Sequence, residues 1–285
     1  MTRRVAWVTA HAARGLDDDE PLALPALRQA GAHVDLVDWD DPGVDWAGYD
    51  CAVIRSTWDY AERAAEFRAW VDAVAAVTDL RNPAPTVHWS LDKHYLRDLA
   101  DAGVAVVPTA FVEPGDEPPF PPGPVVVKPA VGAGSRDAAA YGEGETAAAA
   151  AHVHKLHAQG RAALVQPKLA SVARDGEWPL VFLGGAFSHA ASKRVELPTD
   201  GSPGRLFAPE LNRPHTPDAD QLSVARAAVG VVRERFGIPA YARVDLVRDD
   251  DGSPCVLELE LVEPSLFLAQ ADPDAPARLA AALLP

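Results

Sequence analysis

The sequence predicts an α/β protein that begins with a doubly wound domain and continues into one or two further lobes. Over residues 5–77, short apolar stretches alternate with helical patterns, as in a small doubly wound domain. Proline-containing stretches at 82–85 and 114–124 interrupt that alternation. Residues 241–262 have the pattern of a β-hairpin. A chain of 285 residues is long enough to form a large core in two or three lobes.

The composition argues against several classes of partner. Hydrophobic residues make up 48% of the chain, yet no apolar run is long enough to span a membrane, and the N-terminus lacks the features of a signal peptide. A net charge of −15 argues against nucleic acid and anionic membranes as partners. Cys51 and Cys255 form neither a disulfide framework nor a zinc pattern. We therefore expect a cytoplasmic protein, and leave open whether it is a homo-oligomer.

The first domain is predicted to contain strands and helices in alternation. A helix over 22–30 is expected to stop at Gly31, because glycine readily ends a helix. A second helix over 63–77 places one apolar stripe on its surface, which indicates packing against a core rather than a cofactor site. The strands are expected over 5–9, 33–37 and 50–54.

The rest of the chain is predicted to form elements that hold polar residues in place. Ser90 is suited to cap a helix that runs to about residue 102 and stops at Gly103. Thr216 and Pro217 open another helix. The elements expected between these are a strand over 125–127, a helix over 146–158, a strand over 163–166, and a hairpin of 177–183 with 186–193.

The C-terminal hairpin carries an unusual set of charges. Side chains alternate between the faces of a strand, so Arg243 and Asp245 share one face, and Glu258 and Glu260 share one face of the partner strand. If the turn holds an even number of residues, the three carboxylates lie on the same face, where like charges repel each other. A divalent cation such as Mg²⁺, which prefers oxygen ligands, resolves that repulsion. The alternative is an exposed acidic hairpin in an acidic protein.

Two lysines suit a phosphate group. Lys128 follows a buried strand, and glycines over 132–135 allow backbone N–H groups to approach phosphate oxygens. Lys93 lies early on a helix, where the helix dipole favours anions rather than cations, so a bound phosphate would account for it. Neither motif is an ordinary P-loop. The alternative for each is a solvated surface lysine.

Taken in order, these features resemble the ATP-grasp family of ligases. The resemblance covers the whole chain and is strongest from about residue 90 to 268. It implies the ATP-grasp fold, with a Rossmann-like domain over 1–85, a central lobe over 86–165 that acts as a lid, and a C-terminal lobe over 166–285 that holds the metal, the last two clasping ATP. The order of matching features is Lys93, Lys128 with its glycine loop, a hinge strand over 164–169, Lys193 with Arg194, then Asp245, Glu258 and Glu260.

The resemblance also implies which residues bind ATP and metal. One or two Mg²⁺ ions, with Mn²⁺ as an alternative, are expected on Asp245, Glu258 and Glu260. The sequence departs from the family at Glu260, where asparagine is usual, and the added negative charge bears on how many ions are held. The residues expected to bind ATP are Lys93, Lys128, Gly132, Gly134, Ser135, Gln166, Lys168, Leu169 and Glu177.

The family's chemistry gives the basic residues a role. ATP phosphorylates a substrate carboxylate, and an amine-type nucleophile attacks the acyl phosphate through a tetrahedral intermediate. Positioning and charge neutralisation account for most of the rate. Arg243, Lys193 and Arg194 are therefore expected to hold the transferred phosphoryl group or the intermediate. Ion pairing with the acidic residues of the same site is their other interpretation.

The stretch 55–60 is the candidate for substrate recognition. It follows a predicted buried strand, where doubly wound domains place ligand loops. An amino-acid-like small molecule suits a loop that offers a cation, hydroxyls and a carboxylate, with the expected substrate residues being Arg55, Ser56, Thr57, Asp59 and Tyr60. The alternative is a capped structural loop with Trp58 in the core, in which case residues 188–205 become the place to look.

Three functions therefore compete. The first is an ATP- and Mg²⁺-dependent ligase that activates a small amino-acid-like carboxylate for attack by an amine. The second is a ring-closing ligase, because the motifs around 55–60, 82–83 and 88–93 resemble a bacterial ATP-grasp branch of antibiotic biosynthesis that includes the ligase closing the D-cycloserine ring from O-ureido-D-serine. The third is a nucleotide-binding protein without catalysis, against which the intact Lys128, Arg243, Asp245 and Glu258 argue. A nicotinamide dehydrogenase is disfavoured, since no glycine fingerprint follows the first strand.

Overall fold

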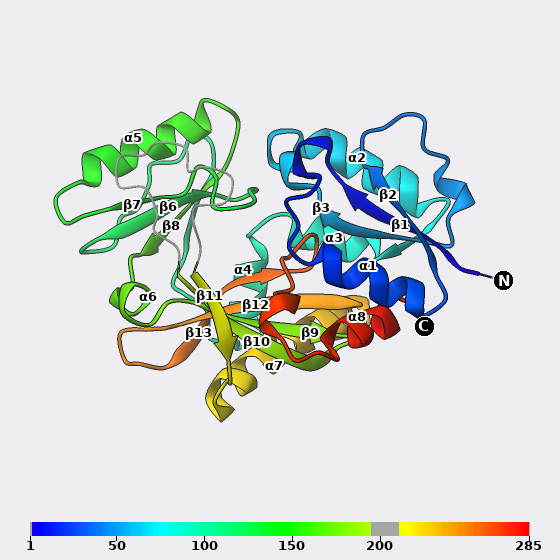
Figure 1. Cartoon of the computed structure of the whole chain (residues 1–285). Coiled ribbons are helices and arrows are strands. Elements are labelled where there is room, and N and C mark those ends of the chain that lie inside the picture. The colour runs from blue at the N-terminus through cyan, green and yellow to red at the C-terminus, as the bar shows by residue number, and fades with distance from the viewer. Residues whose placement is uncertain (1, 195–210, 285) are drawn as a thin grey trace.

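A computed structural model describes residues 2–194 and 211–284 and arranges these residues in three sheets (Figure 1). The N-terminal sheet has the strand order β2-β1-β3-β4 with parallel neighbours. Helices lie on both of its faces, because Leu27 of α1 packs with Val5 and Trp7, whereas Phe67 of α2 packs with Val8. The predicted doubly wound arrangement is confirmed, with these bounds: β1 (Arg4–Thr9), α1 (Glu20–Gln29), β2 (His33–Asp38), β3 (Cys51–Ser56), a 3-10 helix (Trp58–Glu62), α2 (Ala64–Ala75) and β4 (Asp79–Arg81).

The central sheet is antiparallel and has the order β5-β8-β6-β7. Helix α5 lies over it in Figure 1, and its Val153 and Leu156 pack against Val127 and Val165 of the sheet. The opposite face of β6 carries Lys128 toward the C-terminal part of the chain. The elements are β5 (Ala110–Val112), β6 (Val125–Pro129), β7 (Ala139–Tyr141), α5 (Thr146–His157) and β8 (Ala163–Pro167).

The C-terminal sheet is also antiparallel, with the order β11-β10-β9-β12-β13. Helix α7 begins with a capping box, in which the carboxylate of Asp218 accepts a hydrogen bond from the Gln221 backbone and the Gln221 side chain bonds back. The cap lies just after the predicted start at Thr216 and Pro217. The elements are α6 (Ala170–Asp175), β9 (Trp178–Leu183), β10 (Ala186–Arg194), β11 (Leu211–His215), α7 (Ala219–Phe236), β12 (Tyr241–Arg248), β13 (Pro254–Glu260) and α8 (Ala275–Leu283).

Ser90 ends a helix rather than capping one, which corrects the expectation from the sequence. It is the last residue of α3 (Ala84–Ser90), and the next helix is α4 (Tyr95–Asp101). The Ser90 hydroxyl accepts a hydrogen bond from the Leu261 backbone N–H at 3.2 Å. Leu96 and Leu99 of α4 pack in the same core as β12 and β13. The segment that contains α3 and α4 is therefore attached to the C-terminal sheet.

Buried polar contacts join the N-terminal domain to the C-terminal sheet. The Asn82 side-chain amide donates to the carbonyl oxygens of Tyr241 at 2.9 Å and Leu261 at 2.8 Å, and its oxygen accepts from the Ala240 N–H at 2.7 Å. The Tyr241 hydroxyl lies 2.9 Å from the carbonyl oxygen of Ile54. Because buried polar groups are costly unless paired, these contacts fix one domain against the other.

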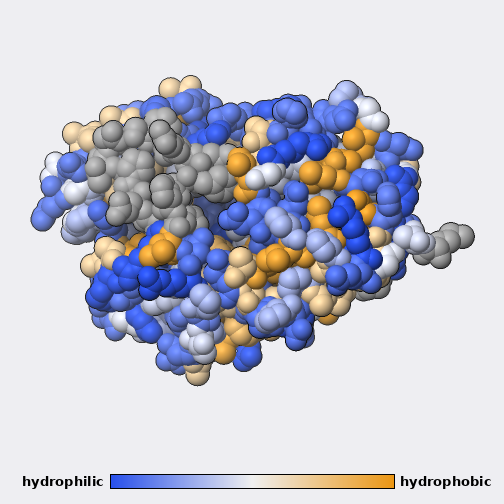
Figure 2. Space-filling view, in the orientation of Figure 1, coloured by the Kyte–Doolittle hydropathy of each residue, from blue (hydrophilic) through white to orange (hydrophobic). Residues whose placement is uncertain are grey.

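None of the described helices has the length and apolar character needed to cross a bilayer. The face shown in Figure 2 is largely hydrophilic, with apolar side chains in separate small groups.

Candidate active site

A cavity of about 760 Å³ lies where the central sheet faces the C-terminal sheet, next to the 3-10 helix Trp58–Glu62. All nine residues expected to bind ATP line it. Among the other predicted site residues, those that line it are Tyr60, Lys193, Arg194, Arg243, Glu258 and Glu260. The structure thus brings together residues that are up to 200 positions apart in the sequence, namely Tyr60 and Glu260.

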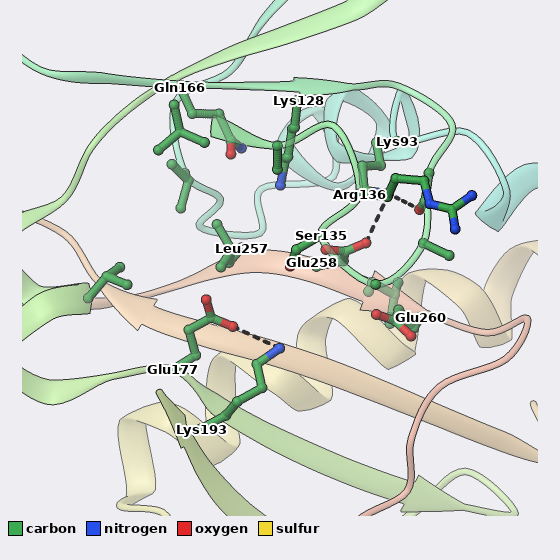
Figure 3. A pocket seen from close by; sticks show the side chains of 18 of the residues that line it. Lys93, Lys128, Ser135, Arg136, Gln166, Glu177, Lys193, Leu257, Glu258 and Glu260 are labelled. Atoms are coloured by element: carbon green, nitrogen blue, oxygen red, sulfur yellow. Dashed lines mark hydrogen bonds and ion pairs between the residues drawn. The ribbon is translucent and has the colours of Figure 1, made fainter. Parts of the chain in front are cut away.

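Lys128 projects into this cavity from β6. Figure 3 shows its side chain pointing from the central sheet toward Glu258 of β13 and Glu177. Burial lowers the pKa of Lys128, while the charge of Glu258 acts in the opposite direction. Within residues 2–194 and 211–284, no carboxylate lies within ion-pair distance of its ammonium group. A partly desolvated cation without a protein counter-charge suits an anionic ligand.

Lys93 is fixed in place by protein groups. Its ammonium lies 2.9 Å from the carbonyl oxygen of Gly132 and 3.1 Å from Oε1 of Glu258. Burial would lower the pKa of Lys93, but the charge of Glu258 outweighs it and raises the pKa. Burial would likewise raise the pKa of Glu258, yet Lys93 and Lys128 hold it well below its usual value. Both groups therefore remain charged at neutral pH.

The glycine loop has the backbone that phosphate approach requires. Gly134 has a φ of 60° and Ser135 one of 58°, in the left-handed region. A Cβ at Gly132 would lie 3.0 Å from Cγ of Pro129, so a larger residue would push against that ring. The next residue, Arg136, forms an ion pair with Glu62 of the N-terminal domain. The loop therefore touches the 3-10 helix on the other side of the cavity.

The predicted adenine-binding stretch lies at the junction of the two sheets. The Gln166 side-chain amide is buried and donates a 2.8 Å hydrogen bond to the Thr109 hydroxyl. The Lys168 backbone N–H donates to the carbonyl oxygen of Pro124 at 2.9 Å, whereas its side chain is exposed. Leu169 and Leu257 add apolar surface to the cavity. A flat heterocycle would find both apolar walls and polar edges here.

The acidic residues of the hairpin share one face, because a register shift between Asp245 and Leu246 pairs Asp245 with Glu258. Arg243 is opposite Glu260 and Asp245 is opposite Glu258 in the antiparallel register. Both oxygens of Asp245 are held by Arg243, at 2.7 and 2.9 Å, and Arg243 also forms an ion pair with Glu260. Of these three acidic residues, Glu258 and Glu260 line the cavity, whereas Asp245 does not. In the described part of the chain, no group of three or more His, Cys, Asp or Glu side chains is arranged to hold a metal ion.

Two oxygen donors nevertheless suit Mg²⁺. Magnesium is commonly held by one or two carboxylates together with substrate phosphates, rather than by a cage made of protein groups alone. Glu258 and Glu260 supply two such carboxylates, because they are two residues apart on one strand and both face the cavity. Burial raises the pKa of Glu260 despite the opposing charge of Arg243, so an added cation would favour its ionised form. The donor set therefore fits a metal that also contacts phosphate.

The two basic residues at the end of β10 differ in their contacts. The Lys193 ammonium lies 3.1 Å from Oε2 of Glu177 and 3.8 Å from Oδ2 of Asp245. Arg194 donates to the backbone carbonyl oxygen of Arg174 at 2.8 Å. Lys193 therefore belongs to the charge network of the cavity, while Arg194 lies at its edge.

Most of the predicted substrate loop lies outside the cavity lining. Arg55 is buried and bonds to the Pro264 carbonyl oxygen, Ser56 bonds to the Thr9 hydroxyl at 2.7 Å, and Asp59 accepts from Trp39 Nε1 at 2.9 Å. Thr57 is fully buried. Strand β3 is an inner strand of its sheet, and its end contacts the C-terminal lobe through the hydrogen bonds of Arg55 to Pro264 and of Tyr241 to Ile54. Of the five residues, Tyr60 lines the cavity, and so does its neighbour Trp58.

Sequence reasoning missed the segment that follows β13. Glu263, Ser265 and Phe267 line the cavity. Glu263 is only 7% exposed and receives a hydrogen bond from the Tyr60 hydroxyl. The available signal was an acidic residue three positions after Glu260.

The other candidate segment, 188–205, is described only up to residue 194, and the remainder lies outside the described residues.

Comparison with known proteins identifies relatives over the whole length. Residues 5–82 match the family model described as the N-terminal domain of D-cycloserine synthetase DcsG. The chain is 40% identical to the cycloserine biosynthesis protein DcsG of Streptomyces lavendulae, over 98% of this chain and 97% of that protein. The crystal structure of D-cycloserine synthetase DcsG is similar with a TM-score of 0.89 and 39% identity, over 98% of both chains.

More distant structures share the fold. D-alanine–D-alanine ligase from Bacillus anthracis, solved with ATP, has a TM-score of 0.67 at 12% identity, over 99% of this chain and 96% of that chain. At that identity the similarity concerns the fold alone, and it agrees with the three-sheet arrangement around a cavity described above. The chain therefore belongs to the family of the cycloserine biosynthesis protein DcsG and is an ATP-dependent ligase with the ATP-grasp fold.

Proposed function

We propose that this protein is a ring-closing ligase that acts on O-ureido-D-serine, using ATP and Mg²⁺. The full-length similarity at 39–40% identity to proteins named for D-cycloserine synthesis supports this substrate. The observation that carries the chemistry is Lys128, whose ammonium has no ion-pair partner among the described residues and points toward Glu258 of β13. A cation for phosphate opposite carboxylates for a metal is the arrangement that phosphoryl transfer needs.

In the proposed reaction, an oxygen of the substrate carboxylate attacks the γ-phosphorus of ATP. The bond from that phosphorus to the β,γ-bridging oxygen breaks, which releases ADP and leaves an acyl phosphate. The ureido nitrogen that is bonded to oxygen then attacks the acyl carbon, loses its proton, and phosphate leaves with the C–O bonding electrons, which closes the ring. Water attacks the carbamoyl group that this nitrogen carries, and the group leaves as carbamate while the nitrogen takes up a proton. Lys128 and Lys93 neutralise the phosphate chain, and Arg243 is placed to stabilise the oxyanion that develops at the acyl carbon.

Glu258 and Glu260 would hold Mg²⁺. Asp245, which is opposite Glu258 in the hairpin, holds Arg243 in place through two hydrogen bonds. When bound, the metal would neutralise phosphate charge and orient the γ-phosphate. The adenine would lie against Gln166, Lys168 and Leu169, with Glu177 across the cavity from Gln166.

The direct test is ADP release by the purified protein with O-ureido-D-serine, ATP and Mg²⁺, followed by mass spectrometry of the product. A ring-closed product formed in a one-to-one ratio with ADP supports the proposal. A linear product that appears only when a second amine is added would indicate intermolecular ligation instead. ATP binding without ADP release in the presence of O-ureido-D-serine or of a panel of amino acids and dipeptides would contradict both.

A further inference from the structure

The carboxylates that line the cavity are mostly paired within the protein. Four glutamates line it, and three have a cation within ion-pair distance: Glu177 with Lys193, Glu258 with Lys93, and Glu260 with Arg243. The fourth is Glu263, and among the described residues no lysine, arginine or histidine forms an ion pair with it. The cavity therefore has one glutamate without a cationic partner among the described residues.

Glu263 is held in surroundings that disfavour an unpaired charge. It is 7% exposed, and Trp58, Tyr60 and Phe267 lie around the same end of the cavity, each less than 9% exposed. Burial, followed by the charge of Glu260, raises the pKa of Glu263. The Tyr60 hydroxyl is near enough to act as a hydrogen-bond donor to this carboxyl group, which opposes the rise in its pKa. A carboxylate with free lone pairs among aromatic rings is well suited to a positively charged ligand.

We propose that Glu263, oriented by Tyr60, binds the α-ammonium group of the substrate and makes a free amino group a requirement for recognition. This inference rests on the proposed function, because it assigns one end of the same substrate. In this inference Glu263, and not Asp59 of the predicted substrate loop, binds the substrate. The carboxylate of Asp59 accepts hydrogen bonds from Trp39 and Arg63.

The position of Glu263 agrees with the geometry of an α-amino acid. In such a molecule the ammonium nitrogen is two bonds from the carboxyl carbon, so its receptor must lie beside the phosphoryl-transfer groups. Glu263 follows Glu260 by three residues and lies close enough for the charges of Glu260, Glu258 and Lys93 to act on its pKa. The ammonium would then complete the pairing of the cavity glutamates.

The backbone that carries Glu263 is held firmly. Asp19 accepts hydrogen bonds from the N–H groups of Leu266 at 2.5 Å and Leu268 at 2.8 Å. The carbonyl oxygen of Ser265 accepts a 3.1 Å hydrogen bond from Arg243. A receptor group fixed in this way loses little entropy when the ligand binds.

The experiment compares O-ureido-D-serine with its analogue that lacks the α-amino group. Steady-state ADP release gives kcat and KM for the amino substrate, and inhibition of that reaction gives Ki for the deamino analogue. The variants are Glu263→Gln, which keeps the shape but removes the charge, and Tyr60→Phe, which removes the orienting hydroxyl. Glu234→Gln, on the exposed face of α7, is the matched control.

Glu263→Gln is expected to lower kcat/KM for O-ureido-D-serine on the order of 100-fold, as for the loss of a hydrogen bond between charged groups. It should leave Ki for the deamino analogue within about twofold, because that molecule never uses the carboxylate. Tyr60→Phe should give a smaller loss in the same direction, and Glu234→Gln none.

The Ki measurement separates recognition from damage to the fold. If Glu263→Gln weakens the deamino analogue as much as the substrate, or leaves kcat/KM unchanged, Glu263 is structural and the inference is overturned while the ligase function stands. If the wild-type protein releases no ADP with O-ureido-D-serine, the proposed function fails and the inference falls with it.

Discussion

The guanidinium of Arg55 donates a 2.7 Å hydrogen bond to the carbonyl oxygen of Pro264, which lies 209 residues further along the chain. The same group lies 3.3 Å from Oδ2 of Asp19 and is almost fully buried with it. Asp19 in turn holds the backbone of Leu266 and Leu268. The end of β3 therefore positions the segment after β13 and does not itself face the cavity.

Arg55→Met should destabilise the protein by about 3–5 kcal/mol, because Asp19 is left as a buried charge without its partner. Chemical denaturation measures this loss, and Arg233→Met on the exposed face of α7 is the control. The double variant Asp19→Asn with Arg55→Met should recover part of the stability, since no lone charge then remains buried. An Arg55→Met protein as stable as the wild type would show that the pair contributes nothing.

Lys128→Ala should weaken ATP binding by about 1–3 kcal/mol, the range for a hydrogen bond to a charged group. Adenosine binding should hardly change, because adenosine has no phosphate for Lys128 to contact. Calorimetric titration of both ligands measures the difference, with Lys155→Ala, at an exposed position of α5, as the control. Equal losses for ATP and adenosine would point to damage of the central sheet instead.

Glu258→Gln should lower kcat by orders of magnitude and raise the Mg²⁺ concentration needed for half-maximal rate, because one carboxylate ligand loses its charge. The substitution also removes the counter-charge of Lys93, so ATP affinity without metal should stay the same or increase. Turnover measured across a Mg²⁺ titration tests both effects. Normal turnover with the normal Mg²⁺ dependence would remove Glu258 from the metal site.

Sequence patterns predicted those site residues whose positions are set by a regular strand or helix. Glu258 and Glu260 are two residues apart on a strand, so the alternation of side chains alone puts them on one face. Lys128 was recognisable because it ends an apolar strand before a glycine loop. These inferences needed only the local chain, and together with the family resemblance they covered the fold and most of the cavity.

The remaining residues depend on contacts that no local pattern contains. Arg55 follows a strand, where a ligand residue is plausible, but its partners Asp19 and Pro264 are supplied by distant segments. Glu263 lies beyond the end of β13, where strand alternation no longer fixes a direction. Ser90 looks like a helix cap, yet its hydroxyl bonds to backbone groups of residues 259 and 261. Tertiary packing decides all three.

His189 links the stability of this region to pH. Its ring is 7% exposed and lies between the Leu266 carbonyl oxygen, at 2.6 Å from Nε2, and the Ser188 hydroxyl, at 2.9 Å from Nδ1. These partners fit a neutral ring that donates from Nε2 and accepts at Nδ1. Burial lowers the pKa of His189; the Leu266 carbonyl and Asp272 act to raise the pKa, and Arg278 acts to lower it.

In the unfolded chain His189 therefore takes up a proton near a pH of about 6.5, whereas in the folded protein it does so only at lower pH. The contribution of His189 to stability is present above a pH of about 6.5 and is lost as the pH falls. His189→Gln keeps a donor but cannot titrate, and its free energy of unfolding should fall less than that of the wild type between pH 7.5 and about pH 5.5. Urea denaturation of both proteins at the two pH values gives the comparison, in which groups common to both cancel. Parallel losses in the two proteins would mean that His189 keeps its ordinary pKa, and that the segment from Glu263 to Phe267 is held by Asp19 and Arg55 without help from a neutral histidine.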